Sequence, residues 1–230
     1  MKKYKTVIFC FSPQVMLATF ALETILAVYA LWRYKWDNVT RLTAALLVFL
    51  AIFQLAEYMI CEAIGLNSLN WAKIGYVAIT LLPPLGIHLA YEISGVKKRP
   101  LLWPAYIAAA AFTVFFVLVG QSIQSQACLG NYVIFSMTPS SGWLYAVYYY
   151  GLVVGGMLLC AALAKKANAS KKRALTLLAV GYGVFLLPTT TVNLLEPSTI
   201  AGIPSIMCGF AVIFAVILSI WILPLVGNKK

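Results

Sequence analysis

Residues 203–225 read IPSIMCGFAVIFAVILSIWILPL, a continuous apolar run without a charged side chain. A helix that crosses the hydrocarbon layer of a bilayer needs about 20 apolar residues, so this run predicts a membrane span. Across the 230 residues, 63% are hydrophobic and 10% are charged, and the mean hydropathy is +0.92. An ordinary soluble domain carries about 25% charged residues. The composition therefore predicts an integral membrane protein and excludes an intrinsically disordered chain.

Six further apolar runs of similar length precede this one, which predicts an all-α bundle of seven transmembrane helices that forms one domain over residues 1–230. We expect the spans at about 7–32, 42–63, 73–94, 101–120, 142–164, 174–195 and 203–225. A transmembrane barrel would instead show alternating strands of about ten residues. The first run continues for a full span without a small-residue cleavage site, so we expect a retained helix rather than a signal peptide.

The net charge of +11 is explained by membrane topology rather than by nucleic-acid binding. Most of the 17 basic residues lie in the short loops that follow the first, third, fifth and seventh predicted spans. Loops rich in Lys and Arg stay on the cytoplasmic side. We therefore expect the amino terminus outside and the carboxyl terminus inside, in a prokaryotic plasma membrane. The lipid bilayer is the first expected partner, and no nucleic acid is expected.

Ionisable residues in the first three spans are candidates for function, because charges are expensive in a bilayer. Glu57 lies in the outer half of the second span, with Glu62 about one turn further out, and Lys73 begins the third. A pair between Glu57 or Glu62 and Lys73 would form the polar floor of an outward-facing ligand pocket, or it would fix the two spans to each other. Glu23, deep in the first span, has no partner that the sequence identifies.

The third predicted span combines a proline pair with a histidine–carboxylate pair. Pro83 and Pro84 each lack a backbone N–H, so carbonyls one turn earlier must be satisfied by neighbouring helices or water. The result would be a hinge or a static bend. His88 and Glu92 share one helix face. They would relay a proton, or form a buried hydrogen bond in which Glu92 reaches a cytoplasmic Arg or Lys.

Aromatic residues open the fifth predicted span, and glycines follow them. The aromatic residues are Trp143, Tyr145, Tyr148, Tyr149 and Tyr150. They are either interface anchors or a wall that faces a ligand. Gly151 and Gly155 form a small-xxx-small pattern, which predicts close helix packing within the chain or in a homodimer.

The five cysteines show no spacing typical of a metal site, so we expect no metal and no cofactor. A disulfide between Cys61 and Cys128 can form if the outer side of the membrane is oxidising, but we expect these cysteines to be free thiols. No nucleotide-binding loop and no paired catalytic carboxylates occur, so we expect no enzymatic activity. The segment 121–141 contains no Lys, Arg, Asp or Glu and would cap the bundle from outside.

Two sets of segments together carry a resemblance to a known family. The segments are FQLAEY (53–58), WAKIGYVAITLLPP (71–84) and YEISG (91–95), then KRALTLLAVG (172–181), GIPS (202–205) and FAVIFAVILSI (210–220). They resemble the amino-terminal seven-transmembrane sensor region of prokaryotic histidine kinases and related diguanylate cyclases. The resemblance implies a receptor-like module that binds a small or hydrophobic ligand, or senses the membrane, and signals through its last helix to an output domain. Because the sequence stops at Lys230, we expect a severed sensor or a stand-alone relative with a separate output or membrane protein as partner.

The leading functional hypothesis is a membrane sensor without enzymatic activity that binds a small molecule. The candidate ligand-binding residues are Glu57, Cys61, Lys73, Tyr76, Tyr149 and Asn193, at the outer ends of four spans. A small-solute or proton-coupled transporter or channel, with His88 and Glu92 on the pathway, is the first alternative. A structural subunit of a larger membrane complex is the second.

Overall fold

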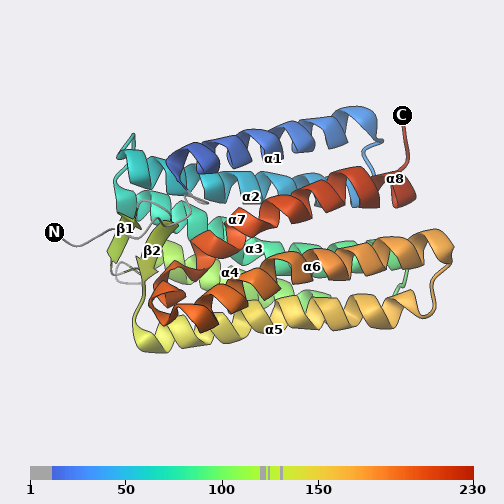
Figure 1. Cartoon of the computed structure of the whole chain (residues 1–230). Coiled ribbons are helices and arrows are strands. Elements are labelled where there is room, and N and C mark those ends of the chain that lie inside the picture. The colour runs from blue at the N-terminus through green and yellow to red at the C-terminus, as the bar shows by residue number, and fades with distance from the viewer. Residues whose placement is uncertain (1–11, 120–122, 124, 130–131) are drawn as a thin grey trace.

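The computed structural model describes residues 12–119, 123, 125–129 and 132–230, and the chain is almost entirely helical there (Figure 1). The long helices are α1 (Pro13–Arg33), α2 (Asn38–Glu62), α3 (Ser68–Ser94), α4 (Leu102–Leu118), α5 (Pro139–Ala164) and α6 (Ala169–Leu195). A last helical segment follows as η1 (Pro197–Gly202), α7 (Ile203–Val216), η2 (Ile217–Ile222) and α8 (Leu223–Val226).

Six helical segments of the described chain are long and apolar enough to cross a membrane. They are α1, α2, α3, α5, α6 and the segment Thr199–Val226. The predicted span 101–120 corresponds to α4, which has 17 residues. At 1.5 Å per residue α4 is about 26 Å long, somewhat less than the ~30 Å hydrocarbon layer. The architecture is therefore that of an integral membrane protein.

Three helices begin earlier than their apolar runs because a polar residue caps each one. Asp37, Asn67 and Asn168 accept hydrogen bonds from the backbone N–H three residues on, at 2.9, 2.8 and 3.0 Å. Such caps satisfy a donor that the first helical turn leaves free. The predicted starts at residues 42, 73 and 174 were therefore four or five residues late, since hydropathy detects the membrane-embedded part of a helix only. The expected start of the first span at residue 7 lies outside the described residues.

A β-hairpin is the exception to the expected all-α fold. Strands β1 (Ser125–Leu129) and β2 (Tyr132–Ser136) pair antiparallel, with Ser125 opposite Ser136 and Leu129 opposite Tyr132. The hairpin lies at the end of the bundle where α2 ends and α5 begins (Figure 1). There β1 contacts α2 and α3, while β2 contacts η1 and α7. The predicted cap over the bundle is thus partly a small sheet.

The helices run side by side, and the core lies between them (Figure 1). α2 packs between α1 and α3, and α6 packs between α5 and α7. The largest fully buried side chains include Phe53 of α2, Leu178 of α6 and Leu218 of η2. Two glycines allow close approach: a Cβ on Gly86 would lie 1.8 Å from the Tyr182 hydroxyl, and one on Gly181 would lie 2.4 Å from the Phe214 ring. Packing of this kind drives helix association in a membrane.

The carboxyl-terminal segment crosses the whole bundle and ends against the α1–α2 connection. Inside it, η2 is a π-helix between α7 and α8. Beyond α8, Asn228 accepts a hydrogen bond from the Lys35 backbone N–H at 2.7 Å and donates its side-chain amide to Asp37 at 2.8 Å. The Lys230 ammonium donates to the Leu31 carbonyl at 2.8 Å. The tail is therefore fixed to the end of the bundle opposite the hairpin.

Asp37 joins two roles at this junction. Its carboxylate caps α2 through Thr40 and holds the tail through Asn228. Partial burial raises the pKa of Asp37, but the hydrogen bonds from Thr40 and Asn228 outweigh that effect and hold the pKa below its ordinary value.

Candidate functional site

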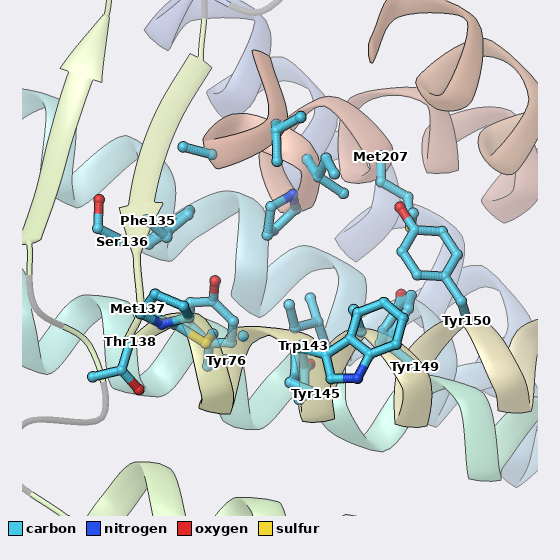
Figure 2. A pocket seen from close by; sticks show the side chains of 18 of the residues that line it. Tyr76, Phe135, Ser136, Met137, Thr138, Trp143, Tyr145, Tyr149, Tyr150 and Met207 are labelled. Atoms are coloured by element: carbon cyan, nitrogen blue, oxygen red, sulfur yellow. The ribbon is translucent and has the colours of Figure 1, made fainter. Parts of the chain in front are cut away.

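The candidate site is a pocket of about 390 Å³ beside the hairpin (Figure 2). Its walls come from α3, β2, α5, η1 and α7, so residues from 76 to 208 meet there. Ligand pockets in proteins span about 300–1,000 Å³ and are lined mainly by apolar and aromatic side chains with a few polar groups. The size and the lining of this pocket fall within that description.

The aromatic residues of α5 form one wall of the pocket. Trp143, Tyr145, Tyr149 and Tyr150 line it, and Figure 2 shows Trp143 and Tyr149 at the α5 side. Tyr145 and Tyr149 are buried, whereas Trp143 is 72% exposed. Four of the five aromatic residues that open the predicted span thus face a cavity. Tyr148 faces α3 and α4 instead, where its ring lies 4.8 Å from that of Phe112.

Tyr76 of α3 links this wall to the hairpin. Its ring centroid lies 5.6 Å from that of Tyr145 and 5.4 Å from that of Phe135 on β2, both in edge-to-face arrangement. Contacts of this geometry are favourable beyond the area they bury. The polar groups of the described lining are tyrosine hydroxyls, Ser136, Thr138, the Trp143 indole N–H and the Cys208 thiol, and none of the described lining residues is charged. The pocket therefore suits a small, largely apolar and uncharged molecule.

The proline pair of α3 is tied to the same wall. Pro84 has no N–H to donate to the Thr80 carbonyl one turn earlier. Tyr148 of α5 supplies that hydrogen bond, with its hydroxyl 2.6 Å from the Thr80 carbonyl oxygen. The Thr80 hydroxyl also lies 3.0 Å from the hydroxyl of Tyr145. The prediction that a neighbouring helix would satisfy the freed carbonyl is confirmed for Thr80.

Glu57 lies behind the pocket rather than on its surface. It is 1% exposed, and the Ser205 hydroxyl of α7 donates to its carboxylate. Ser205 in turn accepts the backbone N–H of Val133 on β2 at 3.2 Å. The carboxylate is close enough to act electrostatically on Tyr76 and Cys208, which both line the pocket. Glu57 therefore joins α2, α7 and the hairpin behind the pocket wall.

Only two of the six predicted ligand-binding residues, Tyr76 and Tyr149, line the pocket. The predicted pair of Lys73 with Glu57 or Glu62 is wrong for the described chain, where Lys73 donates to the Val117 carbonyl at 3.2 Å on the outside of the bundle. Lys73 lies instead in a surface groove that Phe49 and Ile52 of α2 also line.

The other two candidates act on the structure around the pocket. Cys61 is bonded to Cys128 of β1 in a disulfide, so the expectation of free thiols is wrong for this pair. The disulfide attaches the hairpin to α2. Asn193 accepts a hydrogen bond from the Thr199 hydroxyl at 2.6 Å. It lies outside the lining and positions η1, whose Ile200 and Ala201 line the pocket.

The His88–Glu92 pair lies away from the pocket, toward the other end of α3. The Glu92 carboxylate lies 2.5 Å from the Arg99 guanidinium and 3.5 Å from the His88 ring. His88 also lies 3.1 Å from the Tyr106 hydroxyl of α4. The alternative in which Glu92 reaches a basic residue beyond the helix is confirmed by this arrangement.

The small-xxx-small pattern serves no packing within the described chain at Gly151 and Gly155. A Cβ added to either glycine would meet nothing within 4 Å. The neighbouring Gly156, which lies on another face of α5, is the glycine that approaches Tyr182 of α6. The predicted close packing inside the chain is therefore wrong for the pair Gly151 and Gly155.

Among the lining residues that sequence reasoning missed are Phe135, Met207 and Cys208. Phe135 belongs to the hairpin, which hydropathy does not detect, although Gly130-Asn131 between two apolar runs is a typical hairpin signal. Met207 and Cys208 lie in an apolar run in which no residue type stands out. Their role depends on which face of α7 turns toward α5.

The part of the chain that the structure describes contains no group of three His, Cys, Asp or Glu residues able to hold a metal ion. Neither a protein-family model nor a curated protein sequence matches the chain. The pocket beside the hairpin and the buried Glu57 behind it are therefore the features from which a function of the chain can be inferred.

Proposed function

We propose that this chain is a non-enzymatic sensor module of seven transmembrane helices that binds a small apolar molecule in the pocket beside the hairpin. The observation that carries the proposal is the aromatic cavity of about 390 Å³ built from five elements. The orientation places the hairpin outside and the tail in the cytoplasm of a prokaryotic cell, following the distribution of basic residues between the loops. The ligand then enters from outside or from the outer leaflet.

The carboxyl-terminal segment supplies a route from the pocket to the cytoplasmic end. Met207 and Cys208 of α7 line the pocket, and the same helical segment continues through η2 and α8 to the tail held by Asp37. π-helical turns occur frequently at functional sites. A change in the pocket wall would therefore reach the tail through one continuous segment, and a separate output or membrane protein would read it there.

The experiment measures ligand-dependent stability in lipid nanodiscs. The probe is 1-naphthol, an uncharged two-ring compound that matches the aromatic lining. A ligand that binds only the folded state at a hundredfold excess over its Kd stabilises it by about 2.7 kcal/mol. We expect a saturable rise in the Tm of the wild-type chain.

Two tryptophan variants on one helix separate binding in the pocket from partition into lipid. Ala146→Trp fills the pocket from α5 and should abolish the rise in Tm. Val154→Trp adds the same side chain to the exterior of α5, where Val154 is 45% exposed, and should leave the rise intact. Equal shifts in both variants, or no saturable shift in the wild type, would contradict the proposal.

A transporter is the second candidate function, and one observation favours it. A cavity of about 20 Å³ lies next to the pocket, and Tyr149, Met207 and Cys208 line both. It continues the pocket toward Tyr182 in the middle of the bundle. Transport of 1-naphthol into reconstituted liposomes, abolished by His88→Ala, would favour this function over the sensor.

A further inference from the structure

Two carboxyl groups are buried in the membrane-embedded core without the partners that buried charges need. Glu23 of α1 is 0% exposed and Glu57 of α2 is 1% exposed. Among the described residues neither oxygen of Glu23 has a hydrogen-bond partner, and the Oε1 atom of Glu57 has none. Within the described chain, the Ser205 hydroxyl is the group that donates to the Glu57 carboxylate. Three carboxyl oxygens are therefore left unsatisfied.

A third unsatisfied group, a hydrogen-bond donor, lies near Glu57 on α2. Gln54 is 2% exposed and its amide nitrogen has no hydrogen-bond partner. Gln54 and Glu57 lie three residues apart on α2, so their side chains are neighbours on the helix surface. Most buried polar side chains are hydrogen-bonded in native proteins. The Gln54 amide is a donor and needs an acceptor, whereas the three carboxyl oxygens, on helices that contact each other and α7, need a donor or a positive charge.

The described neighbours supply no positive charge. The two ion pairs found in the described part of the chain both use Glu92, at the other end of α3. The titratable and polar groups that face the carboxyls are Tyr76 from α3 and Ser205 and Cys208 from α7, besides the two carboxyls themselves. Glu23 and Glu57 lie close enough to repel each other when both are charged. An isolated charge of this kind in an apolar interior is strongly unfavourable.

We infer that Glu23 and Glu57 form a binding site for a compact monovalent cation, either H⁺ or Na⁺. Positive charge between the carboxyls removes their repulsion and satisfies the unpaired oxygens. The near-complete burial of both carboxyls leaves no opening for a larger organic cation. A transition metal does not fit, because the described residues offer no group of three suitable ligands. The site is separate from the ligand pocket and does not rest on the proposed function.

The first arm of the test examines Na⁺. The Tm of the full chain in nanodiscs is measured in NaCl and in N-methyl-D-glucamine chloride at equal ionic strength. If Na⁺ is the occupant, the wild-type Tm rises saturably with Na⁺, and E23Q and E57Q abolish the rise. E62Q is the matched control, because Glu62 is an exposed carboxylate near the end of the same helix as Glu57. It should retain the full rise.

The second arm examines H⁺ in Na⁺-free buffer at neutral pH. Infrared spectroscopy detects the C=O stretch of a protonated carboxyl, which an ionised carboxylate lacks. If H⁺ is the occupant, the wild type and E62Q show this band, and E23Q or E57Q loses it. Should either Gln variant fail to fold, ²²Na⁺ binding and the infrared band of the wild type alone still decide. A wild type with neither Na⁺ binding nor a protonated carboxyl overturns the inference.

Discussion

At the scale of single residues, Tyr148 replaces a hydrogen bond that Pro84 removes. Its hydroxyl donates to the Thr80 carbonyl from a neighbouring helix. An unsatisfied buried carbonyl costs about 1–3 kcal/mol. Tyr148→Phe should therefore lower the free energy of unfolding by about 1–2 kcal/mol, measured by denaturant titration in mixed micelles.

A double-mutant cycle identifies the cause of that loss. Pro84→Ala restores an N–H that can bond to Thr80, so Tyr148→Phe should cost less in that background than in the wild type. Equal costs in both backgrounds would show that the Tyr148 hydroxyl does not substitute for the missing helical bond.

The two glycines Gly86 and Gly183 should respond in opposite ways to alanine. A Cβ on Gly86 would collide with Tyr182, which is 3% exposed and stacked on Phe214. Overpacking of this kind costs about 1–3 kcal/mol. A Cβ on Gly183 meets only ordinary contacts at 3.9 Å or more, so Gly183→Ala should be neutral or stabilising, by up to about 1 kcal/mol. Thermal unfolding of the two variants compares them directly, and a Gly86→Ala protein as stable as the wild type would contradict the packing argument.

At the scale of elements, the Cys61–Cys128 disulfide holds the hairpin on α2. The bonded cysteines are 67 residues apart, so the crosslink restricts a long segment of the unfolded chain. Native disulfides typically contribute about 2–4 kcal/mol. The double variant Cys61→Ser/Cys128→Ser should lose stability of that order and should bind 1-naphthol more weakly, since Phe135 and Ser136 of the hairpin line the pocket.

The reductant dithiothreitol provides the control for this prediction. It should lower the Tm of the wild type toward that of the double variant and leave the double variant unchanged. A double variant with wild-type stability and affinity would show that the hairpin keeps its place without the crosslink.

Sequence alone predicted the elements better than the site. Hydropathy located the helical runs because a membrane imposes a minimum apolar length, but it placed helix starts late where Asp37, Asn67 or Asn168 caps a helix outside the apolar run. The site required knowledge of helix rotation. Lys73 and Tyr76 lie one turn apart on α3, yet only Tyr76 faces the pocket. Hydropathy does not resolve such differences within one apolar run.

At the scale of the whole molecule, Asp37 makes the attachment of the tail sensitive to acid. Its pKa is lowered in the folded protein, so its stabilising effect is complete above the unfolded value of about 3.9 and is lost as the pH falls through the folded value. As the pH is lowered below about 4, the Tm of the wild type should therefore decrease. Asp37→Asn keeps an acceptor for the α2 cap and should flatten this part of the pH profile. An unchanged profile would show that the tail does not depend on the Asp37 charge.

The π-helix η2 affects how α8 and the tail are rotated about the helix axis relative to α7. Each residue of an α-helix advances the chain by about 100° around its axis, because a turn holds 3.6 residues. A π-turn accommodates additional chain in a turn. If Ile217–Ile222 rewound as an α-helix, α8 and the tail would rotate by roughly 100° relative to Met207 and Cys208. Asn228 would then leave the side of the axis that faces Asp37. The π-helix thus sets the rotational position of the tail relative to the pocket at the opposite end of the bundle.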